Sequence, residues 1–193
     1  MEDETTTTPG AFLQLRKIYQ LRPYLDEHSL MTVTHALVTS RIDYCNALYV
    51  GLPLKTVRRL QLIQNRAARL VSGRATKEHI TPILYNLHWL PVAAQAQFKV
   101  LVLTYKALNG LGPRYLKDRL LPYEPTRRLR SSQGALLKEP SLMEVRGMAC
   151  RHRAFSAAAP KLWNALPSEI RLAPTLMTFR RQVKTFLFQK FFN

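Results

Sequence analysis

The sequence is poor in acidic residues. It has 12 Asp and Glu against 29 Lys and Arg in 193 residues, a formal net charge of +17 at pH 7. Such an excess of one sign repels itself and is typical of proteins that bind a polyanion. Arg outnumbers Lys by 19 to 10, and the guanidinium fork is the better match to phosphate. The leading partner class is therefore nucleic acid, with an anionic membrane or an acidic protein as the alternative.

Cysteines and long apolar runs are also scarce. Cys45 and Cys150 are the only two cysteines and lie far apart, so a disulfide scaffold is excluded and a reducing compartment suits the chain. The longest run without charge, residues 79–98, contains two prolines and five His, Gln or Asn residues, which excludes a membrane span. The N-terminus MEDETTTTPG is not a signal peptide. We expect an intracellular protein, nuclear or cytoplasmic.

Motifs for catalysis and for cofactors are missing as well. Two-metal phosphoryl transfer needs clustered carboxylates, whereas Asp43 is an isolated acid. The sequence has no C-x-x-C or close His pair for zinc, no serine nucleophile elbow and no glycine-rich phosphate loop. We interpret Cys45 as a small core residue and His35 as a residue on a helix flank. We therefore expect no catalytic residue, metal, cofactor or small-molecule substrate.

Proline and glycine divide the chain into helical lengths, so the predicted fold class is mainly α. Apolar spacing predicts helices over residues 11–22, 26–50, 54–72, 91–109, 113–121, 155–166 and 174–192. Short extended pieces are expected near residues 135–137 and 142–145. The expected organisation is a disordered leader (1–10), a helical domain (11–122), a basic linker or irregular segment (123–154) and a C-terminal helical segment (155–193).

Four separated runs occur in the order known from one protein family: SRIDYCNALYVGLPLKTVRRLQLIQNRAARLVSG, HITPILYNLHWLPV, FKVLVLTYKALNGLGPRYLKDRLLPY and RAFSAAAPKLWNALPSEIR. On these runs the chain resembles the C-terminal part of reverse transcriptases from non-LTR retrotransposons, in particular the chicken-repeat and jockey-like group. The likeness covers residues 11–192. It implies a helical thumb-like bundle and the tail after it, which are expected to grip an RNA–DNA or DNA duplex.

The resemblance also implies what is missing from this chain. Members of the family carry a polymerase palm with an aromatic-Ala-Asp-Asp motif, and further upstream an endonuclease. The chain has no such motif, so we expect a non-catalytic fragment. The alternative is a relic open reading frame product with no selected activity. Apolar surface that faced the palm in the parent protein is a candidate for self-association.

The helix expected over residues 54–72 carries the best functional signal. Leu60, Ile63, Ala67, Leu70 and Val71 share one face of this helix. No acid occurs between Asp43 and Glu78, and five bases lie in a sector of about 100° beside the apolar face: Lys55, Arg58, Arg59, Arg66 and Arg69. One face is expected to be buried while the adjoining face contacts phosphates. The alternative is a solvated face, although such faces normally mix charges of both signs.

A second basic group follows on the C-terminal side. It consists of Arg114, Lys117, Arg119, Arg127, Arg128 and Arg130, with Tyr115 and Tyr123 interleaved. A nucleobase stacks readily on such a tyrosine, and the alternative is that both rings form the edge of a core.

Two further aromatic features have a structural interpretation. Trp89 and Trp163 are expected to be packing anchors. The helix expected over 174–192 mixes Phe with Arg and Lys, which is also typical of helices at membrane surfaces. The resemblance favours a nucleic-acid role over membrane binding.

The purified chain should not extend a primer, because it has no clustered carboxylates to hold two Mg²⁺ ions. A template-dependent incorporation assay tests this, with Asp43→Asn as the control for the isolated acid. Incorporation that persists in this variant would contradict the prediction.

Overall fold

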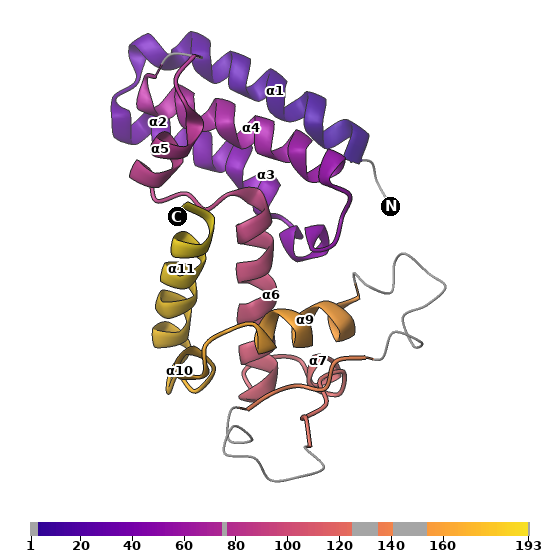
Figure 1. Cartoon of the computed structure of the whole chain (residues 1–193). Coiled ribbons are helices and arrows are strands. Elements are labelled where there is room, and N and C mark those ends of the chain that lie inside the picture. The colour runs from indigo at the N-terminus through magenta and orange to yellow at the C-terminus, as the bar shows by residue number, and fades with distance from the viewer. Residues whose placement is uncertain (1–3, 75–76, 125–134, 141–153, 193) are drawn as a thin grey trace. The chain divides into compact units, whose positions relative to one another are not determined.

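The computed structural model describes residues 4–74, 77–124, 135–140 and 154–192, and these are mainly helical, as the sequence predicts (Figure 1). The chain forms two compact units, one running to Gln95 and the other beginning at Ala96. The division falls within helix α6, Val92–Leu108, whereas a linker was expected over 123–154. Residues 125–134 and 141–153 of that expected linker lie outside the described residues.

The first unit contains five whole α-helices in its described residues: α1 Glu4–Leu21, α2 Glu27–Thr34, α3 Ser40–Asp43, α4 Leu54–Ser72 and α5 Ile80–Asn86. A 3₁₀ turn, Arg22–Tyr24, follows α1. Helix α1 begins at Glu4, so residues 4–10 are helical where a disordered leader was expected. Ala11, Leu15 and Ile18 are buried on one face of α1, and the backbone before Ala11 continues the same helix.

The core of this unit joins α1, α2 and α4. The apolar face predicted for residues 54–72 is confirmed, because Leu60, Ile63, Ala67, Leu70 and Val71 are all buried. Ile63 and Leu70 share a cluster with Leu15 and Ile18 of α1. Trp89 packs against this cluster, which confirms its interpretation as a packing anchor. Burial of this face is what positions the rest of α4.

The single helix expected over residues 26–50 is wrong. Helix α2 passes through a π turn, His35–Thr39, into the short α3, and the helix ends at Asp43. Within this stretch the Thr39 and Ser40 hydroxyls donate to carbonyl oxygens four residues earlier, at 3.1 and 2.6 Å. Such side-chain bonds compete with the backbone ladder and bend helices.

The chain then reverses through Tyr44 and Cys45. Tyr44 is extended and Cys45 is left-handed with φ +56°, and a 3₁₀ turn, Asn46–Tyr49, follows. Cys45 is exposed, so its interpretation as a core residue is wrong. A helical phase calculated through this segment could not reveal the outward turn, because the helix had already ended. His35 is exposed, consistent with a helix flank.

Asp26 caps the start of α2. The backbone N–H of Ser29 donates to Asp26 Oδ1 at 2.7 Å, and this hydrogen bond lowers the pKa of the Asp26 carboxyl. A lowered pKa in the folded state stabilises the fold above the ordinary carboxyl pKa. That contribution is lost as the pH falls through the lowered value.

Two glutamines of α4 hold the start of α6. Gln64 is buried and donates from Nε2 to the carbonyl oxygen of Leu90 at 2.8 Å. The backbone N–H of Val92 donates to Gln61 Oε1 at 2.9 Å, and Gln61 Nε2 donates to Gln64 Oε1 at 2.8 Å. This satisfies one of the free N–H groups at the helix N-terminus and keeps the first turn of α6 with the first unit.

The second unit contains the rest of α6 and four further helices in its described residues: α7 Arg114–Lys117, α9 Phe155–Asn164, α10 Ser168–Arg171 and α11 Leu176–Phe192. The helix expected over 113–121 is only one turn long. Tyr105 stacks on Phe179 at 4.4 Å between ring centroids, and its hydroxyl donates to the carbonyl oxygen of Ala173 at 2.9 Å. Trp163 is buried 5.6 Å from the Phe179 ring, which confirms it as a packing anchor.

The described segment of residues 135–140 is held by both backbone and side chains. Leu137 forms an antiparallel bridge with Pro122. The N–H of Leu137 donates to Asn164 Oδ1 at 2.9 Å, and Asn164 Nδ2 donates to the carbonyl oxygen of Leu137 at 2.8 Å. Trp163 Nε1 donates to the carbonyl oxygen of Ala135 at 2.8 Å. Of the extended piece expected near residues 135–137, only Leu137 forms a bridge, and Ala135 is left-handed with φ +48°. The piece expected near 142–145 lies outside the described residues.

Replacing Leu60 by Ala should lower the free energy of unfolding by about 2–5 kcal/mol, because Leu60 is only 7% exposed in the core. Leu54→Ala on the same helix is the matched control, since Leu54 is 88% exposed and should change stability by less than about 0.5 kcal/mol. Urea unfolding followed by circular dichroism measures both. Equal losses in the two variants would contradict the core assignment.

Candidate nucleic-acid interface

The basic sector predicted on residues 54–72 lies on the exposed side of α4. Lys55, Arg58, Arg59 and Arg66 are all exposed. Burial of the apolar face places these four side chains toward solvent. The structure therefore brings these four predicted residues to one helix face, as the spacing requires.

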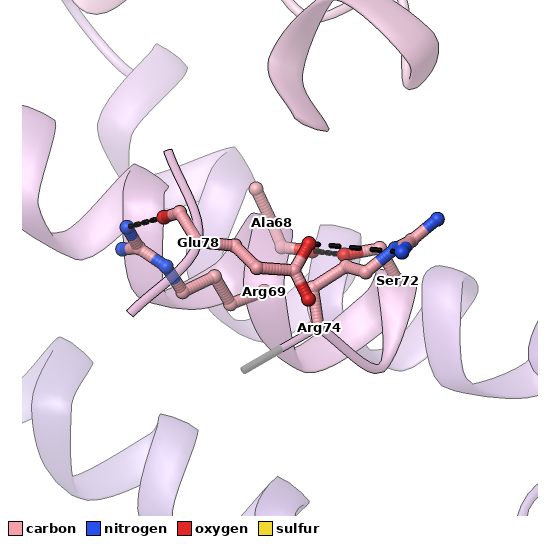
Figure 2. Close-up of polar contacts among 5 residues, drawn as sticks. All are labelled: Ala68, Arg69, Ser72, Arg74 and Glu78. Atoms are coloured by element: carbon pink, nitrogen blue, oxygen red, sulfur yellow. Dashed lines mark hydrogen bonds and ion pairs between the residues drawn. The ribbon is translucent and has the colours of Figure 1, made fainter. Parts of the chain in front are cut away.

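Arg69, the fifth predicted residue, is different because it is only partly exposed. Figure 2 shows its guanidinium group on the segment that follows α4, where Nη2 donates to the carbonyl oxygen of Glu78 at 3.0 Å. Its Nε is buried and has no hydrogen-bond partner within the described ranges. Arg69 is therefore partly occupied in holding the turn after α4.

The turn itself is closed by glycine and one ion pair. Gly73 ends α4 with φ +69°, and its N–H donates to the carbonyl oxygen of Arg69. Arg74 lies 3.6 Å from the carboxylate of Glu78 (Figure 2). Glu78 thus accepts from Arg69 through its backbone and pairs with Arg74 through its side chain.

An open groove of about 1180 Å³ lies between α1 and α4. The two helices lie side by side and run in the same direction (Figure 1). The Arg66 guanidinium sits 4.6 Å above the centre of the Phe12 ring. Just past the ends of the two helices, the Arg22 guanidinium lies beside Gly73, where an added Cβ would come within 2.5 Å of it. Five arginines line the groove: Arg16, Arg22, Arg66, Arg69 and Arg74.

The charge of the groove is not balanced locally. No acidic side chain of the described residues lines it. Glu78 forms an ion pair with Arg74, so its negative charge is subtracted from the charge of the groove. The C-terminal ends of α1 and α4 add about −0.5 each. Five positive charges less one for Glu78 and about one for the two helix ends leave about +3. Helix dipoles and Glu78 together therefore do not neutralise the five arginines. A bound anion would balance the positive charge that is left.

Arg16, Arg22 and Arg74 are functional candidates that the sequence did not indicate. Arg16 comes from α1 and Arg22 from the 3₁₀ turn that follows it, Arg22–Tyr24, and both line the groove with Arg66 because α1 packs on α4. Arg74 follows the C-terminal glycine of α4. A pair of bases six residues apart in the sequence is too common a pattern to have identified this site.

The second predicted group is described only in part. Arg114 and Lys117 are exposed on α7, while Arg127, Arg128 and Arg130 lie outside the described residues. Tyr115 and Tyr123 are both exposed, which does not fit the alternative that they form the edge of a core. Both rings are accessible for stacking.

Helix α11 uses its apolar face inside the second unit. Phe179, Val183 and Leu187 are buried, while Arg180, Arg181 and Lys190 are exposed. No helix within the described part of the chain is long and apolar enough to cross a membrane. No group of three or more His, Cys, Asp or Glu in that part lies close enough together to hold a metal ion.

Comparisons with known proteins found no match: no family model fits the chain, and neither a curated protein nor a solved structure is significantly similar to it. The resemblance to non-LTR reverse transcriptases therefore stays a prediction that rests on the four sequence runs.

Replacing Arg69 by Gln should lower the free energy of unfolding by about 1 kcal/mol, because the Glu78 carbonyl loses a charged donor. The control Arg58→Gln removes one charge from the exposed face of the same helix and should stay within about 0.5 kcal/mol. Urea unfolding at 0.15 M salt measures both variants. Identical stabilities would mean that Arg69 does not hold the turn.

Proposed function

We propose that this chain is a non-catalytic C-terminal fragment of a retrotransposon reverse transcriptase that binds the nucleic-acid backbone. The ligand is an RNA–DNA or DNA duplex, and sequence specificity is low. The observation that carries the proposal is the exposed face of α4, on which Lys55, Arg58, Arg59 and Arg66 lie without an acid between Asp43 and Glu78.

The shape of this face supports phosphate contact. From Lys55 to Arg66 the face is about 16 Å long at 1.5 Å per residue, so it can lie beside several phosphates of a duplex. Guanidinium contacts to phosphate fix position and carry no base information. Such a surface therefore binds the nucleic-acid backbone with low sequence specificity.

The other proposals have less support. For membrane binding, the apolar face of α11 is already used in the core through Phe179, Val183 and Leu187. A relic without selected activity would keep the net charge but has no reason to use one helix face more than another. Affinity that depends on the α4 face separates this alternative from specific binding.

Changing Arg58, Arg59 and Arg66 to Gln should weaken duplex binding and flatten the log–log salt slope by about 2 to 3, since each phosphate contact contributes about 0.9. Gln is a good helix former, so α4 should remain helical. Fluorescence anisotropy with a blunt 20-base-pair duplex, read between 50 and 300 mM salt, measures the slope.

The control for bulk charge is a triple change of Arg180, Arg181 and Lys190, all exposed on α11, to Gln. Arg171 is unsuitable as a control, because its Nη1 donates to the carbonyl oxygens of Asn164 and Leu166. Equal losses of affinity and slope in the two triple variants would mean that net charge alone binds the duplex, and would favour the relic alternative.

A further inference from the structure

We infer that the groove between α1 and α4 binds a single-stranded nucleic acid, with a base stacked on Tyr19 and its phosphates on the surrounding arginines. This inference rests on the proposed function and deepens it, because it assigns a second ligand form to the same unit. The proposed duplex face of α4 shares Arg66 with the groove, whereas its Arg58 and Arg59 do not line the groove.

The groove combines charge with accessible apolar surface. Its lining includes Phe12, Leu15 and Leu70, and the exposed Leu13 and Leu62. A duplex presents phosphates and hides the faces of its bases, so it makes few contacts with apolar side chains of this kind. A single strand exposes its bases, and sites for single strands pair a positive groove with stacking platforms.

Tyr19 is the stacking platform that the groove offers. Its side chain is 65% exposed and lines the groove. Arg16 lies three residues before it on α1 and Arg22 three residues after it in the following 3₁₀ turn, and all three side chains line the groove. An aromatic ring therefore sits between two guanidinium groups, an arrangement that suits a base with a phosphate on either side.

The opposite wall provides further donors. Arg66 stacks over Phe12 and so remains within the groove. Arg69 also lines the groove, with Nη2 donating to the carbonyl oxygen of Glu78. Arg22 reaches the far end of the groove, where a Cβ at Gly73 would meet its Nη2 at 2.5 Å, so glycine leaves room for this guanidinium.

The test compares ligands that differ only in their bases. Fluorescently labelled 12-nucleotide dT and U strands, an abasic 12-mer with the same phosphates and a blunt 12-base-pair duplex are titrated into the full chain at 0.15 M salt. The inference predicts tighter binding of the dT and U strands than of the abasic strand. The two single strands together distinguish a DNA from an RNA preference.

Tyr19→Ala should weaken binding of the dT or U strand by at least about 5-fold, since stacking of one base contributes about 1–3 kcal/mol. Binding of the abasic strand and the duplex should be unchanged. Tyr24→Ala is the matched control, because Tyr24 is 85% exposed and does not line the groove. Tyr19→Phe keeps the ring and should restore affinity, which also excludes loss of folding as the cause.

The outcomes separate this inference from the proposed function. Equal affinity for the abasic and dT strands, or equal effects of Tyr19→Ala and Tyr24→Ala, would overturn the stacking site while duplex binding stands. Binding of neither single strand nor duplex would overturn both proposals. Loss of dT binding in Tyr19→Phe as well as Tyr19→Ala would also overturn the inference, because the phenyl ring alone supports stacking.

Discussion

The packing of α1 on α4 is the contact on which the rest of the first unit depends. Leu15 and Ile18 of one helix share a buried cluster with Ile63 and Leu70 of the other. The same contact places arginines of both helices around one groove, where they repel each other. Apolar burial must therefore offset a like-charge cost, and the basic groove is a consequence of how the core closes.

This arrangement would link stability to the proposed binding of a polyanion. A polyanion that occupies the groove removes the repulsion among the arginines and stabilises the folded state by mass action. High salt would screen the repulsion in the absence of a ligand. Arg69 contributes both to the fold and to the charge of the groove. Its Nη2 donates to the Glu78 carbonyl oxygen, while its guanidinium group lines the groove.

The second unit is held by aromatic packing and by side chains that pair with backbone. Trp163 and Tyr105 surround Phe179, while Asn164 pairs with the backbone of Leu137. Each polar group of this set has a backbone partner, as buried polar groups usually do. Buried aromatic rings whose polar ends are hydrogen-bonded specify one packed core, and Trp163 therefore has a structural role. Tyr115, by contrast, is exposed to solvent.

The sequence by itself determined the mainly helical fold, the net charge and the buried face of residues 54–72, because apolar periodicity and composition are local properties. It could not indicate the reversal of the chain at Cys45. The backbone is left-handed there, although the helical spacing of apolar residues continues past it in the sequence. Only the tertiary structure decided that Arg16 and Arg22 line one groove with Arg66, and that Arg69 turns partly inward to Glu78. Which helix faces pair depends on contacts between residues far apart in the chain, and single-helix spacing carries no information about them.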